Sequence, residues 1–199
     1  TLNQTHLYAT KTHLDVLKEY GIENISEEYI ISKFGAAFDD YMREVFPDKD
    51  EAFKRQYAQK VAKLERSYLK QYGQPFPGIE SMLQQLQQKG YILGVCSNAS
   101  LDYIHCVLEA LGLQQYIDYC QPIIKGKAKT ASLEELLSRL NHSQAVMVGD
   151  RIFDLQAAKE NNIPFIGCLY GYCPNELAQC KYLAQTPENI SKIVDSIML

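Results

Sequence analysis

The sequence lacks a long apolar run, a surplus of positive charge and any Cys-x-x-Cys pair. No apolar run approaches the roughly 18 residues that a membrane-spanning helix needs, so we expect no membrane partner. The formal net charge is −4, which offers no electrostatic basis for binding nucleic acid. With 199 residues, 46% hydrophobic and 22% charged, the chain is typical of a globular protein with one large domain, or a core plus an insertion.

A zinc site is poorly supported. The six cysteines are scattered, and only four histidines are present. Cys96 and Cys168 lie within apolar, strand-like runs, where a free thiol behaves as a small hydrophobe. We therefore expect reduced thiols and a cytoplasmic protein.

The chain changes character near residue 73. Residues 5–72 show helical periodicity, with a helix start at Ser26 and a break at Gly35. Beyond residue 73, apolar runs alternate with amphipathic segments. This alternation predicts an α/β fold, a doubly wound parallel sheet of the Rossmann type, joined to an all-helical insertion. The expected strands are residues 91–96, 119–124, 145–148 and 164–169.

Asp150 and Asp154 follow the third of these predicted strands. Ligands of open α/β sheets bind at the carboxyl ends of strands, and magnesium prefers carboxylate oxygens. The two acids therefore indicate a metal site for Mg²⁺. The alternative is an ordinary strand followed by a helix cap, because aspartate caps helices well.

Two other predicted strands also end in polar residues. Ser97 and Asn98 follow the first strand, and Lys125, Lys127 and Lys129 follow the second. A hydroxyl and free backbone N–H groups at a helix start can hold a phosphate oxygen, and a lysine adds positive charge. Singly, Ser97 fits a helix cap and the lysines fit a solvated loop. Together with the two aspartates they indicate a phosphoryl-transfer site.

With these motifs the chain resembles the haloacid dehalogenase (HAD) superfamily hydrolases that carry a helical C1-type cap, in the phosphoglycolate phosphatase-like group. Ser97 matches the second motif of the family. Lys129 matches the third-motif lysine better than the other two lysines, because of its register against the apolar face of the next helix. Gly149, Asp150 and Asp154 match the fourth motif.

The resemblance implies a domain organisation. Residues 1–4 and 73–199 would form the HAD-like core, and residues 5–72 the helical cap. In the family, one segment of the cap faces the active site and contacts the substrate. That segment is matched by residues 33–37, of which Phe34, Gly35 and Ala36 would lie nearest the bound leaving group.

The resemblance also implies an activity, that of a magnesium-dependent phosphatase acting on a small phosphate ester. Ser97, Asn98 and Lys129 would bind the phosphoryl group, Asp150 would ligate Mg²⁺ and Asp154 would support the metal. The first two residues, Thr1 and Leu2, resemble the tail of the first motif, Asp-x-Asp-Gly-Thr-Leu. The attacking aspartate and the general acid/base are therefore expected upstream of Thr1.

Two alternatives stay open. The chain could be a non-catalytic domain that binds a phospho-ligand or a protein partner, or it could be a phosphomutase of the same family. A monomer and a homodimer both fit the sequence.

Overall fold

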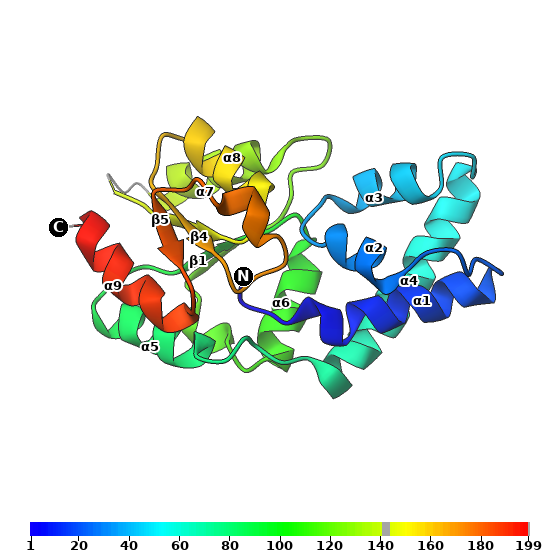
Figure 1. Ribbon diagram of the computed structural model, residues 1–199, viewed down its shortest axis with the longest axis horizontal. Helices are drawn as coiled ribbons and strands as arrows, with labels where there is room; N and C mark the ends of the chain where they lie inside the picture. Colours follow the sequence, from blue (N-terminus) through cyan, green and yellow to red (C-terminus); the bar gives the residue numbers. More distant parts are fainter. Residues whose placement is uncertain (141–143, 199) are drawn as a thin grey trace. The chain divides into compact units, whose positions relative to one another are not determined.

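The computed structural model describes residues 1–140 and 144–198, and the chain divides into two compact units (Figure 1). One unit comprises Thr1–Leu2 and Pro75–Leu199, and the other comprises Asn3–Gln74. The sequence pattern predicts unit boundaries after residues 4 and 72, whereas the structure has them after residues 2 and 74. That the inserted unit acts as a cap stays a prediction.

The inserted unit is helical, as the periodicity of its sequence predicts. Ser26 begins a helix as expected, because its Oγ accepts a hydrogen bond from the N–H of Tyr29 at 3.2 Å. Asp50 caps the longest helix in the same way, through the N–H of Phe53 at 2.7 Å. Gly35, with φ of +88°, separates two of the helices. The elements are η1 (Thr5–Leu7), α1 (Ala9–Glu19), α2 (Glu27–Ser32), α3 (Phe38–Val45) and α4 (Glu51–Tyr72).

The core of the helical unit contains a buried histidine among aromatic rings. The Nδ1 atom of His13 lies 2.8 Å from the hydroxyl of Tyr57, and that hydroxyl lies 3.1 Å from the hydroxyl of Tyr41. Both tyrosines are buried in the cluster that also holds Val16 and Leu17. Burial disfavours the charged imidazolium and lowers the pKa of His13 to about 4.

The second unit alternates strands and helices, which confirms the α/β class with parallel strands. Its strands are β1 (Gly94–Cys96), β2 (Tyr119–Gln121), β3 (Met147–Gly149), β4 (Phe165–Cys168) and β5 (Tyr182–Ala184). Its α-helices are α5 (Ile79–Gln88), α6 (Leu101–Ala110), α7 (Lys129–Leu140), α8 (Ile152–Glu160) and α9 (Pro187–Met198). Two short 3₁₀-helices complete it: η2 (Gln114–Tyr116) and η3 (Pro174–Leu177).

All strand pairs described in this unit are parallel, and they form two sheets rather than one. β1 pairs with β2, and β4 lies between β3 and β5. Helices α7 and α8 lie together on one side of the strands, while α5 and α9 lie together on the other (Figure 1). β5 was not predicted, because a three-residue strand is too short to show a period in the sequence.

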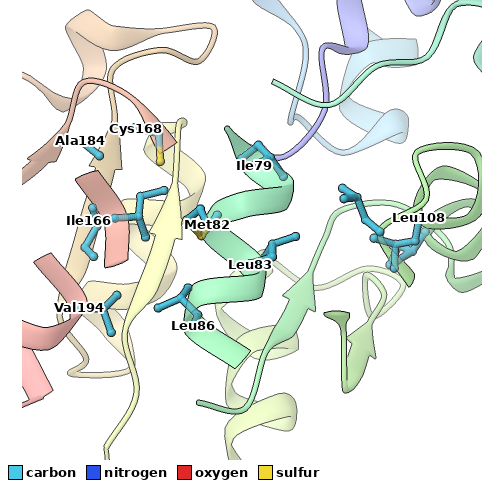
Figure 2. Close-up of a cluster of buried hydrophobic side chains, with 12 residues drawn as sticks. Ile79, Met82, Leu83, Leu86, Leu108, Ile166, Cys168, Ala184 and Val194 are labelled. Atoms are coloured by element: carbon cyan, nitrogen blue, oxygen red, sulfur yellow. The ribbon is translucent and has the colours of Figure 1, made fainter. Parts of the chain in front are cut away.

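The larger core of this unit is built on one face of α5. Ile79, Met82, Leu83 and Leu86 recur at helical spacing and are buried. Figure 2 shows this face of α5 beside Ile166 of β4. Cys168 and Ala184, the last residues of β4 and β5, belong to the same buried cluster.

We find no helix among residues 1–140 and 144–198 with the length and apolar character needed to cross a membrane.

Candidate active site

Strand β3 ends at Gly149 and delivers Asp150 and Asp154 to the start of α8. One carboxylate oxygen of Asp154, Oδ2, accepts hydrogen bonds from the N–H groups of Asp150 and Arg151, both at 3.1 Å. A Cβ on Gly149 would lie 2.3 Å from the Cβ of Asp154, so only glycine allows this close return of the chain. Asp154 is therefore both the cap of α8 and part of the candidate site.

Asp150 is 4% exposed and lies beside the first residue of the chain. Its Oδ1 accepts hydrogen bonds from the amino group of Thr1 at 2.7 Å and from the Thr1 hydroxyl at 2.6 Å. Its Oδ2 accepts one from the N–H of Tyr172 at 3.2 Å. Burial raises the pKa of Asp150, but the positive amino group and these hydrogen bonds outweigh it and lower the pKa to about 2.

The loop after β4 approaches Asp150 closely because it contains glycine. A Cβ on Gly171 would lie 2.2 Å from the Cβ of Asp150. The sequence does not predict this contact, because Gly171 and Asp150 lie far apart along the chain. The signal in the sequence was a glycine in a loop that follows a strand.

Lys129 is the first residue of α7, and its Nζ donates a hydrogen bond to Oδ1 of Asp154. Burial lowers the pKa of Lys129, but the Asp154 carboxylate raises it more, so the net shift is upward and the amine stays charged. Lys125 and Lys127, the other two candidates, are exposed. The structure thus brings Lys129 alone of the three against the fourth motif.

Ser97 follows β1 directly, as predicted. Its N–H donates to the carbonyl of Gln121 at 3.0 Å, and its Oγ accepts from the N–H of Ala99 at 3.2 Å. Asn98 is partly buried next to it. The neighbouring thiol of Cys96 has its pKa raised to about 11, chiefly by burial, with smaller and opposite effects from the charges of Lys129 and Asp154. The end of β1 therefore lies within electrostatic range of Lys129 and Asp154, although β1 and β3 belong to different sheets.

The predicted cap segment lies between α2 and α3 of the helical unit. Phe34 packs against the apolar core of that unit, and Gly35 is exposed with a positive φ. The N–H of Ala36 donates to the carbonyl of Lys33 at 3.1 Å, which closes the turn. The role of these three residues toward a substrate stays a prediction.

The two carboxylates, Asp150 and Asp154, could supply only part of the ligands of a magnesium ion. Asp150 is an ionised carboxylate whose oxygens can accept more than the contacts they make, while Asp154 is engaged by Lys129 and two N–H groups. Within residues 1–140 and 144–198, we find no cluster of three or more His, Cys, Asp or Glu side chains that could hold a metal. Mg²⁺ commonly binds through one or two carboxylates plus substrate phosphate and water, so a partial protein site is compatible with it.

An ion pair that the sequence does not predict lies beside the two aspartates. Arg151 pairs with Glu176, which lies in η3. Nothing in the local sequence connects these two residues, because they are 25 positions apart. Their contact depends on how the loop after β4 folds back onto α8.

Comparisons with known proteins concern the family and the fold of this chain. Residues 1–168 match the family described as haloacid dehalogenase-like hydrolase. Two curated relatives are each called phosphoglycolate phosphatase. The protein from Aquifex aeolicus is 26% identical over 191 residues, which cover 90% of this chain and 85% of the relative. The protein from Synechococcus elongatus is 27% identical over 130 residues, which cover 63% of this chain and 61% of the relative. The match to the second protein therefore spans less than two thirds of its length.

Solved structures share the fold. A haloacid dehalogenase-like hydrolase from Streptococcus pneumoniae superposes with a TM-score of 0.85 at 18% identity, covering 98% of this chain and 93% of that one. A predicted phosphoglycolate phosphatase from Haemophilus somnus gives a TM-score of 0.84 at 20% identity, covering 98% and 93%. At such identities the likeness concerns the fold alone.

Proposed function

The chain belongs to the haloacid dehalogenase-like hydrolases, and on this premise we propose that it is a magnesium-dependent phosphatase of small phosphorylated metabolites. The observation that carries the proposal is the meeting of Asp150, Asp154 and Lys129 where β3 ends and α7 and α8 begin. Two carboxylates and one buried cation are the charges that a phosphoryl group and its magnesium ion need.

The phosphoryl group would be held by Lys129 and Ser97. Lys129 keeps its positive charge, since its pKa is raised, and buried charge acts more strongly than charge in water. The hydroxyl of Ser97, which follows β1, would donate to another phosphoryl oxygen. These groups recognise phosphate and are indifferent to the alcohol attached to it.

Asp150 would bind the magnesium ion. An aspartate with its ordinary pKa is already ionised at physiological pH, and Asp154 would hold the turn in place and support the metal through its hydrogen bonds. The ion, when bound, neutralises negative charge on the phosphoryl oxygens. Following the resemblance, an aspartate upstream of Thr1 would attack phosphorus and displace the alcohol. Water would then cleave the resulting aspartyl-phosphate with help from a second aspartate.

The helical unit would act as the cap that selects the substrate, with Phe34, Gly35 and Ala36 nearest the leaving group. The relatives named phosphoglycolate phosphatase favour a small phosphorylated acid as the substrate. A cap that closes over the site would also exclude bulk water.

Phosphate release from a panel of phosphate esters, with and without MgCl₂, tests the proposal. The protein should carry any residues that are encoded before Thr1. We expect magnesium-dependent turnover that is lost in Asp150→Asn. Tight binding of a phosphate ester without hydrolysis would support a non-catalytic binding domain instead, and conversion of one sugar phosphate isomer into another would support a phosphomutase.

A further inference from the structure

Glu176 binds the turn between β3 and α8 through three hydrogen bonds. Its Oε2 accepts from Nε of Arg151 at 3.1 Å and from the N–H of Ile152 at 2.8 Å. Its Oε1 accepts from Nη2 of Arg151 at 3.3 Å. One carboxylate from η3 therefore holds both a side chain and a backbone group that directly follow Asp150.

The segment that carries Glu176 also contacts Asp150 itself. Tyr172, four positions before Glu176, donates its N–H to Oδ2 of Asp150. On the other side of Glu176, Leu177 is fully buried against β4, where it would meet a Cβ on Gly167 at 3.3 Å. The loop after β4 is thus anchored by the buried Leu177. It contacts the turn between β3 and α8 through Tyr172 and through Glu176.

The three N–H groups at this turn are all bound by carboxylates. Asp154 accepts those of Asp150 and Arg151, and Glu176 accepts that of Ile152. Those of Arg151 and Ile152 are among the N–H groups that the start of a helix leaves without a partner in the helix. Asp154 and Glu176 therefore hold the backbone on which Asp150 stands, while the Asp150 carboxylate itself is held by Thr1 and by the N–H of Tyr172.

Stability alone does not account for the ion pair. Arg151 is 7% exposed, and its buried Nη1 finds no hydrogen-bond acceptor in the described chain. Buried ion pairs with incomplete hydrogen bonding are often no more stabilising than apolar residues of the same volume. What apolar residues cannot supply is the directed contact with Ile152 N–H.

We propose that Arg151 and Glu176 are positioning residues that hold Asp150 in the orientation needed to bind magnesium. The inference rests on the proposed function, because it requires that Asp150 binds magnesium. Groups that orient a metal ligand typically contribute about 10- to 100-fold to metal affinity or activity.

The test compares the double variant Arg151→Met with Glu176→Leu against the double variant Lys89→Met with Asp195→Leu. Lys89 and Asp195 form another ion pair of the same unit, which makes no contact with Asp150 or Asp154 in the described structure. Three quantities are measured on each protein: the melting temperature, the Mg²⁺ affinity by calorimetry, and the hydrogen exchange of the amides at positions 150–152. Glu176→Gln, which keeps an acceptor for Ile152, is measured as well.

We expect the Arg151/Glu176 double variant to keep its melting temperature within a few degrees, to bind Mg²⁺ about 10- to 100-fold more weakly, and to exchange the amides at 150–152 faster. A high magnesium concentration should then restore kcat. Glu176→Gln, which also serves if the double variant does not fold, should show a smaller loss of affinity. The control pair should leave Mg²⁺ affinity and these amides unchanged.

Unchanged Mg²⁺ affinity and unchanged exchange in the folded double variant, or in Glu176→Gln if only that variant folds, would overturn the inference. So would a loss of affinity that the control pair shows equally. If the wild-type protein itself binds no Mg²⁺ and hydrolyses no ester, the proposed function fails and the assignment to a metal site fails with it. Hydrogen exchange would still report whether the pair holds the turn, so the two failures are distinguishable.

Discussion

Lys129 donates a hydrogen bond to Asp154 across 25 positions of the chain, and the two side chains are 13% and 7% exposed. The contact ties the start of α7 to the turn that carries Asp150. Removing one partner of a buried ion pair leaves the other charge without compensation, which typically costs about 3 to 5 kcal/mol. The residues of the candidate site therefore also stabilise the α/β unit, because their ion pair joins α7 to α8.

Asp150→Asn should abolish magnesium-dependent turnover while the protein stays folded, because the substitution keeps the shape of the side chain and removes its charge. Asp154→Asn should retain more turnover, since Asp154 acts through hydrogen bonds, but should lower the free energy of unfolding by about 3 kcal/mol. Activity assays and urea denaturation measure the two effects. Wild-type turnover and Mg²⁺ affinity in Asp150→Asn would contradict the metal assignment.

Alanine at Lys129 should cause a large loss of turnover, and alanine at Lys125 or Lys127 a small one. Lys129 is buried against Asp154, whereas the other two lysines are exposed. Steady-state kinetics on the three variants decide the matter, with Lys125→Ala and Lys127→Ala as the matched controls. A large loss at either control position would show that our match to the third motif is wrong.

Gly171→Ala should reduce turnover and Mg²⁺ affinity, because its Cβ would lie 2.2 Å from the Cβ of Asp150 and would force the loop away. The hydrogen bond from Tyr172 to Asp150 would then lengthen or break. Gly94→Ala is the control: the closest atom to its Cβ would be the flexible end of Leu136, at 3.2 Å, and the carbonyl oxygen of Tyr119 would lie at an ordinary contact distance of 3.8 Å. Calorimetric titration with Mg²⁺ measures the difference, and equal affinities in the two variants would refute the argument.

Acid should destabilise the helical unit through His13. The folded pKa is about 4 and the ordinary value is 6.5, so between these values the unfolded chain binds a proton that the folded chain excludes. The contribution of His13 to stability is complete above about pH 6.5, falls as the pH drops to about 4, and is constant below that. Its full size is about 3 kcal/mol, at about 1.4 kcal/mol per pKa unit.

Denaturation of His13→Gln from pH 4 to 7.5 checks this prediction. In His13→Gln, the free energy of unfolding should lose the part of its pH dependence that His13 causes. His105→Gln should keep that pH dependence, because His105 lies at an exposed position of the other unit. Identical slopes in wild type and His13→Gln would contradict the assignment.

A bulky residue at Gly35 should change the ranking of substrates across a panel of phosphate esters without removing Mg²⁺ binding. The reason is that the core recognises phosphate only, so that discrimination must come from elsewhere. Since Gly35 has a φ of +88°, any substitution also adds backbone strain of about 1 to 2 kcal/mol. Gly21→Ala, at a φ of +69° with open space around the position, controls for that strain. An unchanged ranking in the folded variant would place specificity elsewhere, with the Tyr170–Tyr172 loop the next candidate.

The sequence by itself determined the features that depend on neighbours a few residues away. The period of apolar residues indicated which segments are helices and strands, and Ser26 marked a helix start that the structure confirms. The α/β class followed from the alternation of such segments. Asp150 and Asp154 were recognisable because both follow the end of a strand within a few residues.

Only the tertiary structure decided which distant residues meet. The contacts of Glu176 with Arg151, of Tyr172 with Asp150 and of His13 with Tyr57 join positions 22 to 44 residues apart. No local pattern encodes them, because they depend on how loops fold back and helices pack. The pairing of the strands into two sheets was also decided by the tertiary structure. Which strands form hydrogen bonds with each other depends on packing rather than on the composition of any one strand.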